Sequence, residues 1–393
     1  MVHPHAIDTE LQALEQLGLL RVPDDGSTRR LALAAAEALG VEFIDASSND
    51  YLGLAGHEAP EAVSRETAAP GTPVSEPVGS GASRLVHGSR RAHVDLERSL
   101  AGWVGAEAAL LFSSGFAANL GLLGAVAGEG DVILSDALNH ASIVDGCRLS
   151  RARVLKVPHL DLLALEQLLS ELPPEQPRWF VTESYFSMDG DGPELDRVAA
   201  VCRRHGAGLI VDEAHALGVM GTGGAGLCSL AGLRPDAIVG TLGKAVGSQG
   251  AFVAGSASLR SLLWNRARSF VFSTAPSPLL SQISLFHVKQ LNGMEAERAR
   301  LAMLAQEVRA GLRRSGVPVG RSFGPIIPVL MPPNERVLNA AARLAERGIL
   351  AQAIRSPTVP PGTERLRITL QATLSLASSE RLVRELAEVC HAS

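Results

Sequence analysis

Thr241-Leu-Gly-Lys-Ala-Val-Gly-Ser-Gln-Gly250 is the stretch around which this chain is organised, because it isolates one lysine among small, uncharged neighbours. Apart from Lys244, no charged residue occurs between Asp236 and Arg260. An ammonium group in such surroundings is poorly solvated, so we expect the pKa of Lys244 to fall below its usual value. The neutral amine is the form that attacks carbonyl carbons and makes Schiff bases. A lone lysine is more often an exposed surface residue, so the interpretation depends on the residues that precede it.

Apolar strands flank this stretch, and strands alternate with helices through the middle of the chain. Ala237-Ile-Val-Gly240 precedes the lysine and Ala251-Phe-Val-Ala254 follows it. Upstream strands are predicted at residues 108–112, 131–135, 179–182 and 208–212, and a helix-like segment follows each of the first three. Buried strands that alternate with helices predict an α/β fold with a mostly parallel central sheet and helices on both faces.

The pattern changes after about residue 285, where a smaller C-terminal α+β domain is predicted. Its expected elements are a charged helix over 295–314, strands at 326–330, 348–354 and 365–370, and helices at 334–347 and 379–389. An amphipathic helix over 7–20 and a short strand over 41–44 open the chain. We therefore expect an N-terminal segment over residues 1–55, a large α/β domain over 56–290 and a small domain over 291–393.

One C-terminal strand combines apolar residues with two arginines. In Arg365-Leu-Arg-Ile-Thr-Leu370, strict alternation buries the three apolar residues and turns Arg365, Arg367 and Thr369 to the opposite face. Because a guanidinium presents the planar fork that a carboxylate prefers, Arg367 is a candidate carboxylate ligand. A solvated strand face would explain Arg365 equally well.

Composition and charge exclude several classes of protein. The chain has 393 residues, 46% of them hydrophobic, and 39 glycines, which is typical of a globular α/β enzyme. A net charge of −5 gives no basic footprint for nucleic acid. The four cysteines form no CxxC pair, so we expect reduced thiols in a cytoplasmic protein and no cysteine metal clip. Residues 108–128 are uncharged and long enough to cross a bilayer, but Ser113-Ser-Gly115 and Asn119 interrupt them, so we expect a strand and a helix there rather than a membrane span.

Polar residues follow three of the predicted strands, at the carboxyl ends where ligands of open α/β sheets bind. Ser113-Ser-Gly-Phe-Ala-Ala-Asn119 is a glycine turn that opens into a helix, and its free backbone N–H groups suit a phosphate. Asn139-His-Ala-Ser142 places a histidine where it can lie over an aromatic ligand, although such a residue is more often a helix cap. Thr182-Glu-Ser-Tyr-Phe-Ser-Met-Asp-Gly-Asp191 ends in an acidic turn.

A fourth strand runs directly into Asp212 in Val211-Asp-Glu-Ala-His-Ala-Leu-Gly218, so its carboxylate requires a cation. A metal held by Asp212, His215 and Asp189 is one alternative, although no further ligand occurs at a usable spacing. A protonated ring nitrogen is the other cation that fits. An aspartate paired with a pyridinium nitrogen, together with a Schiff-base lysine, is the signature of pyridoxal phosphate enzymes. Asp212 and Lys244 are about one βαβ unit apart, as that signature requires.

The order of these motifs resembles the α-oxoamine synthases, a branch of the fold-type I pyridoxal phosphate enzymes. The resemblance extends from about Asn49 to Leu370. The motifs that carry it are Ser48-Asn-Asp-Tyr-Leu-Gly53, Ser114-Gly-Phe-Ala-Ala-Asn119, Asn139-His-Ala-Ser142, Val181-Thr-Glu-Ser-Tyr-Phe-Ser-Met-Asp-Gly-Asp191, Val211-Asp-Glu-Ala-His215 and Thr241-Leu-Gly-Lys244.

The resemblance implies a role for individual residues. It assigns catalysis to Lys244, which forms the Schiff base and moves protons at the substrate α-carbon, to Asp212, which holds the pyridinium proton, and to His140, which stacks on the ring. It assigns further cofactor contacts to Gly115, Phe116, Ser187, His215 and Thr241, and to Thr274, which would reach a neighbouring subunit's phosphate. It assigns substrate contacts to Arg21, Asn49, Thr358 and Arg367.

The resemblance also implies substrates and an assembly. The run Arg355-Ser-Pro-Thr-Val-Pro-Pro-Gly-Thr-Glu-Arg-Leu-Arg367 looks most like the family members that join L-alanine to pimeloyl-CoA, or to its carrier-protein equivalent, with loss of carbon dioxide. A homodimer with shared active sites is expected, without nucleic-acid or membrane partners. A sister synthase acting on glycine or serine, a non-catalytic subunit of the same fold and a metal-dependent hydrolase remain alternatives.

One loop departs from the family pattern. Where the family often has Gly-Ser-Gly-Gly-Ser, this chain has Gly79-Ser-Gly-Ala-Ser-Arg84. Ala82 and Arg84 therefore leave open the shape of this loop and of the acyl pocket that it is expected to line.

Overall fold

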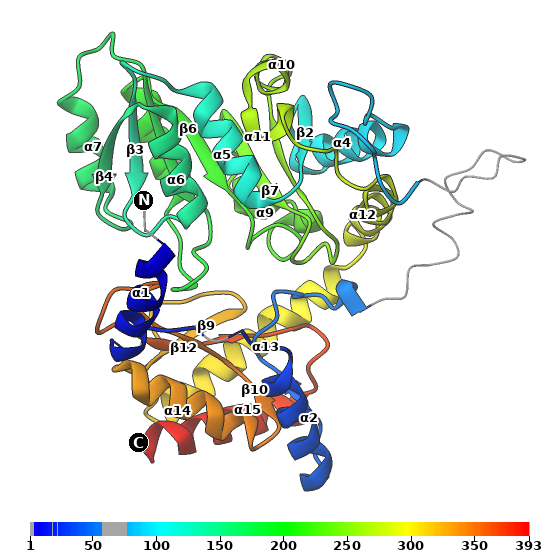
Figure 1. The fold of residues 1–393 in the computed structure, drawn as a ribbon, viewed down its shortest axis with the longest axis vertical. Coiled ribbons are helices and arrows are strands. Elements are labelled where there is room, and N and C mark those ends of the chain that lie inside the picture. Colours follow the sequence, from blue (N-terminus) through cyan, green and yellow to red (C-terminus); the bar gives the residue numbers. More distant parts are fainter. Residues whose placement is uncertain (1–3, 18, 22, 57–76, 393) are drawn as a thin grey trace, which may run out of the picture. The chain divides into compact units, whose positions relative to one another are not determined.

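A computed structural model describes residues 4–17, 19–21, 23–56 and 77–392. These residues form two compact units (Figure 1). The larger unit comprises the described parts of 50–187 and 191–299, and the smaller unit comprises the described parts of 1–49, 188–190 and 300–393. The boundaries at residues 55 and 290, which the sequence suggests, stay predictions.

The larger unit is built on one seven-stranded sheet. The strands are β2 (Ala108–Phe112), β3 (Val132–Asp136), β4 (Arg153–Val157), β5 (Arg178–Glu183), β6 (Gly208–Asp212), β7 (Ala237–Thr241) and β8 (Ala251–Gly255). Their order across the sheet is β2-β8-β7-β6-β5-β3-β4. Strands β3 to β7 are mutually parallel, and only β8 runs antiparallel to its neighbours β7 and β2. The mostly parallel sheet expected from the sequence is confirmed.

Helices cover both faces of this sheet. On one face lie α5 (Gly115–Val126), α6 (Ala141–Ser150), α10 (Ala257–Arg266) and α11 (Arg268–Val271), whose apolar side chains share a core with alternate residues of the strands. On the other face lie α4 (Arg91–Val104), α7 (Leu162–Ser170) and α8 (Leu195–Arg204). The unit also contains α9 (Gly226–Leu230) and α12 (Pro278–Leu291). Because successive strand residues face opposite sides, a strand buried on both faces is mainly apolar, as β3 is from Val132 to Leu134 before it ends in the buried polar residues Ser135 and Asp136.

Helix α5 packs closely against its neighbours because of a glycine. A Cβ at Gly121 would lie 2.5 Å from Ser269 Oγ and 2.8 Å from the Phe112 ring. Only a residue without a side chain permits that approach. The glycine thereby fixes the distance of α5 from the sheet, and with it the position of the glycine turn at the start of this helix.

The strand register brings the expected site residues to one edge. Glu183 lies opposite Asp212, and Asp212 lies opposite Val239. The carboxyl ends of β5, β6 and β7 therefore share an edge, which is where ligands of open α/β sheets bind.

The smaller unit joins the N-terminal segment to the C-terminal elements. Its three-stranded antiparallel sheet has the order β11 (Gln352–Ile354), β12 (Arg365–Thr369), β9 (Ile326–Leu330). A separate parallel pair is made by β1 (Ile44–Asp45) and β10 (Ile349–Leu350). The helices are α1 (Pro4–Gln16), α2 (Ser27–Leu39), α14 (Asn334–Ala345) and α15 (Leu376–His391), and α13 (Glu295–Arg314) enters from the larger unit. The single strand predicted over 348–354 is thus two short strands with different partners.

Strand β12 corrects one sequence interpretation. Leu366 and Ile368 are buried as predicted, but Arg365 and Arg367 are only 4% and 5% exposed. The interpretation of Arg365 as part of a solvated strand face is wrong, because β12 is the central strand of its sheet and is covered on both faces. Arg365 Nη1 lies 2.6 Å from Asp189 Oδ1, so a carboxylate compensates its buried charge.

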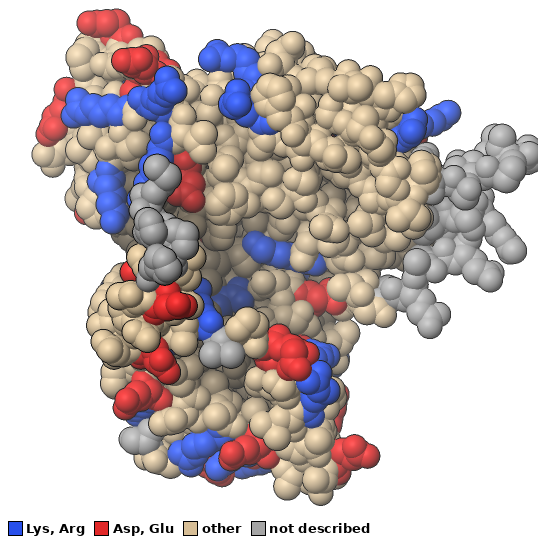
Figure 2. All heavy atoms as spheres, viewed as in Figure 1, with Lys and Arg blue, Asp and Glu red and all other residues tan. Residues whose placement is uncertain are grey.

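No helix in the described part of the chain has the length and apolar character needed to cross a membrane. The uncharged run over 108–128 is divided between β2 and α5. On the face drawn in Figure 2, basic and acidic side chains are interspersed, without a broad basic area.

His159 links three connections at the edge of the sheet where the carboxyl ends of the parallel strands lie. His159 follows β4, and its Nδ1 lies 2.8 Å from Asp136 Oδ1 at the end of β3. Its Nε2 lies 3.3 Å from Asp191 Oδ1 in the connection after β5. Burial alone would lower the pKa of His159, but hydrogen bonds and charges from the two aspartates outweigh burial and raise the pKa to about 10.

This pKa shift predicts a pH-dependent stability that His159→Gln removes. Because the folded-state pKa lies above the ordinary value of 6.5, the ion pairs contribute fully below that pH and are lost as pH rises through about 10. One pKa unit is worth about 1.4 kcal/mol, so a contribution on the order of 3 kcal/mol remains after allowance for solvent screening. The wild-type thermal midpoint should exceed that of the variant at neutral pH, and the two should converge above pH 10. A difference that stays constant over this range would contradict the assignment.

Candidate active site

The loop that carries Lys244 is fixed by its own backbone. Leu242 N donates to Gly250 O at 2.9 Å, and Gly247 N donates to Lys244 O at 2.8 Å. Gly247 has a φ of 66°, and a Cβ there would lie 2.5 Å from Ala55 N. The loop is therefore closed directly after β7 and packed against residues 54–55, which leaves the Lys244 side chain half-buried.

The Lys244 amine is joined to a chain of buried polar groups. Its Nζ lies 2.8 Å from Nε2 of His215, and Nδ1 of His215 lies 2.7 Å from the Tyr51 hydroxyl. His215 is 6% exposed and Tyr51 is fully buried. When the tyrosine hydroxyl donates to Nδ1, Nε2–H can donate to the lysine, which then accepts as a neutral amine. This arrangement provides a partner for the nucleophilic form of Lys244.

Asp212 ends β6 as a buried carboxylate with defined donors. Its Oδ2 accepts a hydrogen bond of 2.8 Å from Asn119 Nδ2, and its Oδ1 accepts one of 2.9 Å from Ala214 N. Asn119 also donates to Ser142 Oγ at 3.0 Å, so helices α5 and α6 both help to fix this carboxylate. Each carboxylate oxygen retains a second acceptor site, which leaves capacity for one more cationic donor.

His140 and Glu183 lie within reach of the same charges. His140 N donates to Glu183 Oε1 at 2.7 Å, and His140 Nδ1 lies 2.7 Å from Ser142 Oγ. Burial among protein atoms lowers the pKa of His140, the charge of Asp212 opposes this shift and the charge of Lys244 adds to it. Burial raises the pKa of Glu183, and the charge of Asp212 raises it further. The charges of Asp212 and Lys244 thus act on both residues, so all four belong to one cluster.

The glycine turn offers free donors at the start of α5. Ser114 caps the helix by accepting a 3.1 Å hydrogen bond from Ala117 N. A Cβ built at Gly115 meets nothing within 4 Å, so space lies in front of the helix terminus. The Phe116 ring lies edge-on to His140, with centroids 6.5 Å apart. A phosphate would find backbone N–H groups and a favourable helix dipole here.

Three more sequence-predicted cofactor residues lie in the same unit. The Thr241 hydroxyl, at the end of β7, donates to Gly250 O at 3.2 Å. Ser187 is half-buried in the connection after β5. Thr274 is exposed on the segment between α11 and α12, where it forms a β-bridge with Ser83.

The predicted substrate residues form two pairs in the smaller unit. Arg21 Nη2 lies 2.6 Å from Thr358 Oγ1 in an exposed contact. Arg367 Nη2 donates to Asn49 Oδ1 at 2.9 Å, and its Nη1 donates to Thr369 Oγ1 at 3.1 Å. Both of these acceptors are neutral side-chain oxygens. A guanidinium presents the planar pair of donors that a carboxylate prefers.

The larger unit's residues fit pyridoxal phosphate better than a metal. An amine, a carboxylate with an unused acceptor site, an imidazole and an open helix terminus match the aldehyde, ring nitrogen, ring face and phosphate. Among the residues that the structure describes, no three His, Cys, Asp or Glu side chains gather as metal ligands would.

Sequence reasoning did not assign three residues that the structure places in this cluster. Asn119, Tyr51 and Glu183 each lie inside a quoted motif, but none has a chemistry that stands out in the sequence. Tyr51 precedes His215 by 164 residues, so only the folded chain shows that the two meet. For Asn119, a polar side chain within an otherwise apolar helix was the available signal.

Comparison with known proteins agrees with this geometry. The family model described as aminotransferase class I and II matches residues 41–386. An 8-amino-7-oxononanoate synthase from Anaeromyxobacter sp. (strain Fw109-5) is 46% identical over 385 residues, covering 98% of this chain and 95% of that protein.

Two solved structures share the fold. A serine palmitoyltransferase from S. paucimobilis with bound PLP-myriocin aldimine has a TM-score of 0.85 and 26% identity, covering 98% of this chain and 97% of that one. An 8-amino-7-oxononanoate synthase from Francisella tularensis has a TM-score of 0.73 and 26% identity, covering 88% of this chain and 97% of that one. The chain belongs to the aminotransferase class I and II family. The predicted fold class and the resemblance to the α-oxoamine synthases are confirmed.

We predict that Asn119→Ala weakens cofactor binding. The change leaves the buried Asp212 Oδ2 without its side-chain donor. A hydrogen bond to a charged group is worth about 1.5–3 kcal/mol, so the dissociation constant for pyridoxal phosphate should rise about tenfold or more. Fluorescence titration of the cofactor-free protein measures this constant.

Asn139→Ala is the matched control for this prediction. Asn139 is also a buried asparagine, but its amide donates to Ser135 Oγ and Val181 O rather than to Asp212. Its loss should lower the thermal midpoint and change the dissociation constant less than about threefold. Equal weakening by the two substitutions would show that Asp212 does not depend on Asn119 in particular.

Proposed function

We propose that this chain uses pyridoxal 5′-phosphate to condense L-alanine with a pimeloyl thioester, either pimeloyl-CoA or a pimeloyl-carrier protein. The reaction releases carbon dioxide and yields 8-amino-7-oxononanoate, a step of biotin biosynthesis. The observation that carries the reaction class is the Lys244 amine, held 2.8 Å from His215 beside the buried Asp212 carboxylate. The near-full-length similarity to an 8-amino-7-oxononanoate synthase supports the choice of substrates.

The bound cofactor supplies an electron sink that makes the α-carbon of an amino acid acidic. The chain supplies the proton transfers. Lys244 removes a proton from the α-carbon as a neutral amine and later returns one, because its Nζ is a basic atom that His215 links to the buried Tyr51 hydroxyl. The connected hydrogen bonds allow the imidazole to change tautomer as the amine gains or loses its proton.

The remaining residues bind and orient. We assign the pyridinium nitrogen to Asp212, the ring face to His140, and the ring oxygen region to Ser187 and His215. The phosphate is assigned to the N–H groups of Gly115 and Phe116, to the Thr241 hydroxyl and, from a neighbouring subunit, to Thr274. This last assignment requires a homodimer with shared sites, which we also propose.

The paired residues of the smaller unit are assigned to the substrates. Arg367 holds a substrate carboxylate, supported by Asn49, because a guanidinium buried in the sheet offers a carboxylate two parallel donors in a fixed orientation. Arg21 and Thr358 line the acyl-substrate site. The metal-dependent hydrolase has no supporting geometry among the described residues.

A sister synthase is the second candidate, because a serine palmitoyltransferase shares the fold over nearly the whole chain. Such an enzyme would prefer glycine or serine, as 2-amino-3-ketobutyrate ligase, 5-aminolevulinate synthase and serine palmitoyltransferase do. The two candidates differ in amino-acid choice and not in the lysine chemistry, so one assay separates them.

The test is coenzyme A release from a panel of acyl-CoA thioesters with alanine, glycine and serine. We expect the largest kcat/KM for L-alanine with pimeloyl-CoA, and a product with the mass of 8-amino-7-oxononanoate. A larger value for glycine or serine would assign the chain to a sister synthase.

Lys244→Ala is the control for chemistry in the same assay. It should abolish turnover with every pair, and borohydride should no longer attach the cofactor to the protein in intact-mass spectra, because the attacking amine is gone. Full turnover in this variant would refute the mechanism.

A pair of substitutions tests the substrate assignments. Arg367→Gln should raise KM for the amino acid about tenfold or more, the cost of one charge-assisted contact, with little change in KM for the thioester. Arg21→Gln should show the reverse pattern. Steady-state kinetics with each substrate varied in turn measures both. The same pattern from both variants would mean that the two arginines do not serve separate substrates.

A further inference from the structure

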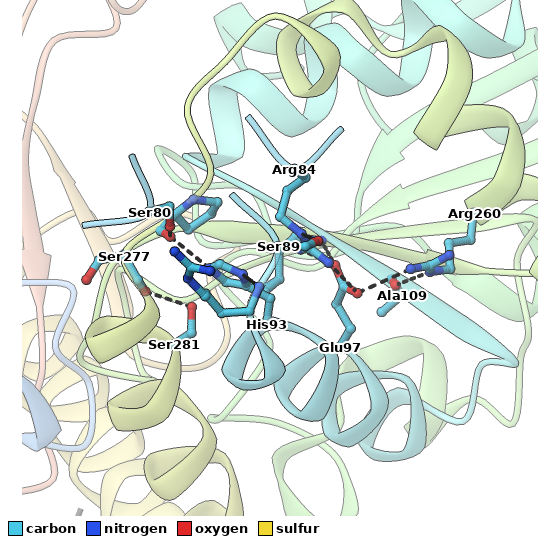
Figure 3. A network of polar contacts seen from close by, with 12 residues as sticks. Ser80, Arg84, Ser89, His93, Glu97, Ala109, Arg260, Ser277 and Ser281 are labelled. Atoms are coloured by element: carbon cyan, nitrogen blue, oxygen red, sulfur yellow. Dashed lines mark hydrogen bonds and ion pairs between the residues drawn. The ribbon is translucent and has the colours of Figure 1, made fainter. Parts of the chain in front are cut away.

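Arg84, one of the two residues that leave the shape of the Gly79–Arg84 loop open, forms a buried ion pair with Glu97 in the larger unit. Its Nη1 donates to Glu97 Oε1 at 2.8 Å and its Nη2 to Glu97 Oε2 at 3.3 Å, while its Nε donates to Ser89 Oγ at 2.8 Å (Figure 3). The two charged side chains are only 1% and 5% exposed. A two-point contact of this kind fixes orientation as well as distance.

Glu97 is in turn held from several sides. Its Oε1 accepts from Leu111 N at 3.0 Å, and its Oε2 accepts from Arg260 Nη2 at 3.4 Å. The guanidinium groups of Arg84 and Arg260 also lie over the Trp264 ring, at 5.4 and 5.3 Å. The backbone of β2 therefore fixes the carboxylate, and the longer contact from Arg260 of α10 adds less to its position. Glu97, fixed in this way, in turn holds Arg84 and the loop.

The loop forms a tight turn, so fixing Arg84 fixes the residues around it as well. Ser83 O accepts hydrogen bonds from Gly88 N at 2.8 Å and from Val86 N at 3.1 Å. A Cβ at Gly88 would lie 2.0 Å from Ala82 O. Residues 82–88 thus form one compact turn, and the ion pair of Arg84 with Glu97 holds this turn against helix α4.

The same turn holds the segment that contains Thr274. Ser83 forms a β-bridge with Thr274, and Ala275 N donates to Ala82 O at 3.0 Å. Ser80 Oγ donates to Pro276 O at 2.6 Å. The backbone around Thr274 is therefore placed by the turn and not by a helix of its own.

Helix α4 holds both segments from one face. His93 and Glu97 are one turn apart, and His93 Nε2 lies 2.8 Å from Pro276 O. Burial lowers the pKa of His93, so the neutral ring can donate through Nε2 and accept from Arg90 N through Nδ1. Figure 3 shows these two anchors on neighbouring turns of the helix.

We propose that Arg84 is a positioning residue for the cofactor site. Its buried ion pair with Glu97 fixes the turn over 82–88, and this turn fixes the backbone at Thr274, whose hydroxyl is assigned to the cofactor phosphate of a neighbouring subunit. The inference rests on the role proposed above for Thr274. The ion pair and the turn also show the shape of the Gly79–Arg84 loop, which the sequence alone left open.

The test is the dissociation constant of pyridoxal phosphate, measured by titration of the cofactor-free full-length protein. Arg84→Gln and Thr274→Ala should each raise it about tenfold or more, the effect expected when a contact to a charged group is lost. The dissociation constant of the double variant should not exceed the larger of the two single-variant values, because both changes remove the same contact. The proposal would be overturned if the two fold-changes multiplied in the double variant, or if Thr274→Ala left the dissociation constant unchanged.

Arg260→Gln is the matched control. Arg260 shares Glu97 and Trp264 with Arg84, and its hydrogen bonds go to Ala109 O and Glu97 rather than to the turn. A purely structural role predicts that both arginine variants weaken cofactor binding in proportion to their loss of thermal stability. The positioning role predicts a change of less than about threefold for Arg260→Gln. Equal weakening by the two would overturn the proposal.

Gly88→Ala covers the case in which Arg84→Gln does not fold. It leaves every charge in place but drives the turn away from Ala82 O. It should weaken cofactor binding as Arg84→Gln is expected to do, and unchanged binding would overturn the proposal. None of these measurements needs a substrate, so failure of the alanine and pimeloyl assay would be distinguished from failure of this inference.

Discussion

A carboxylate buried at the end of a parallel strand is the constraint on which this structure depends. Asp212 ends an apolar strand at the centre of the sheet, where an uncompensated charge would be costly. The chain meets this requirement with a side-chain amide from α5 and a backbone amide from its own loop. Hydrogen bonds from neutral donors stabilise the anion without neutralising it, so an attractive site for a cationic ring remains.

Buried charge recurs in this unit, and in each case an ion pair joins two separate elements of the chain. Arg84 and Glu97 join a loop to α4, and His159 joins the connections that follow β3 and β5. Removing one member of such a pair leaves the other charged and desolvated, which costs more than the intact pair contributes. The positions of the active-site loops therefore depend on these buried polar contacts as well as on the apolar core.

The fold was largely predictable because its central strands are apolar runs that end in polar residues. Strand β2 and the strand ending at Asp212 were predicted with the bounds that the structure gives. Strand β4 was missed because it lies at the sheet edge and exposes most of its residues, including Arg153, so it lacks a continuous apolar run. Helix α10 was also missed, since its polar and apolar residues show almost no helical separation.

For the site, the residues at strand ends were predictable, because topology alone brings carboxyl ends to one edge. The polar contacts between distant segments were not predictable. Neither the link from Tyr51 to His215 nor that from Arg84 to Glu97 leaves a periodic signal in the sequence. The arginines of β12 show the same limit: alternation gave the side of the strand on which they lie, but not that this side is covered as well.

The parallel pair of β1 and β10 has a consequence for synthesis of the chain. Ile44 pairs with Ile349, so about 300 residues separate the two partners. At roughly 5–20 residues per second, a ribosome needs about 15 to 60 s between making the first partner and the second. During that time the early strand has no edge to join, whereas the seven-stranded sheet between them can already assemble. The segment that carries β1 therefore leaves the ribosome well before the strand that completes its pairing, and it reaches its native place late.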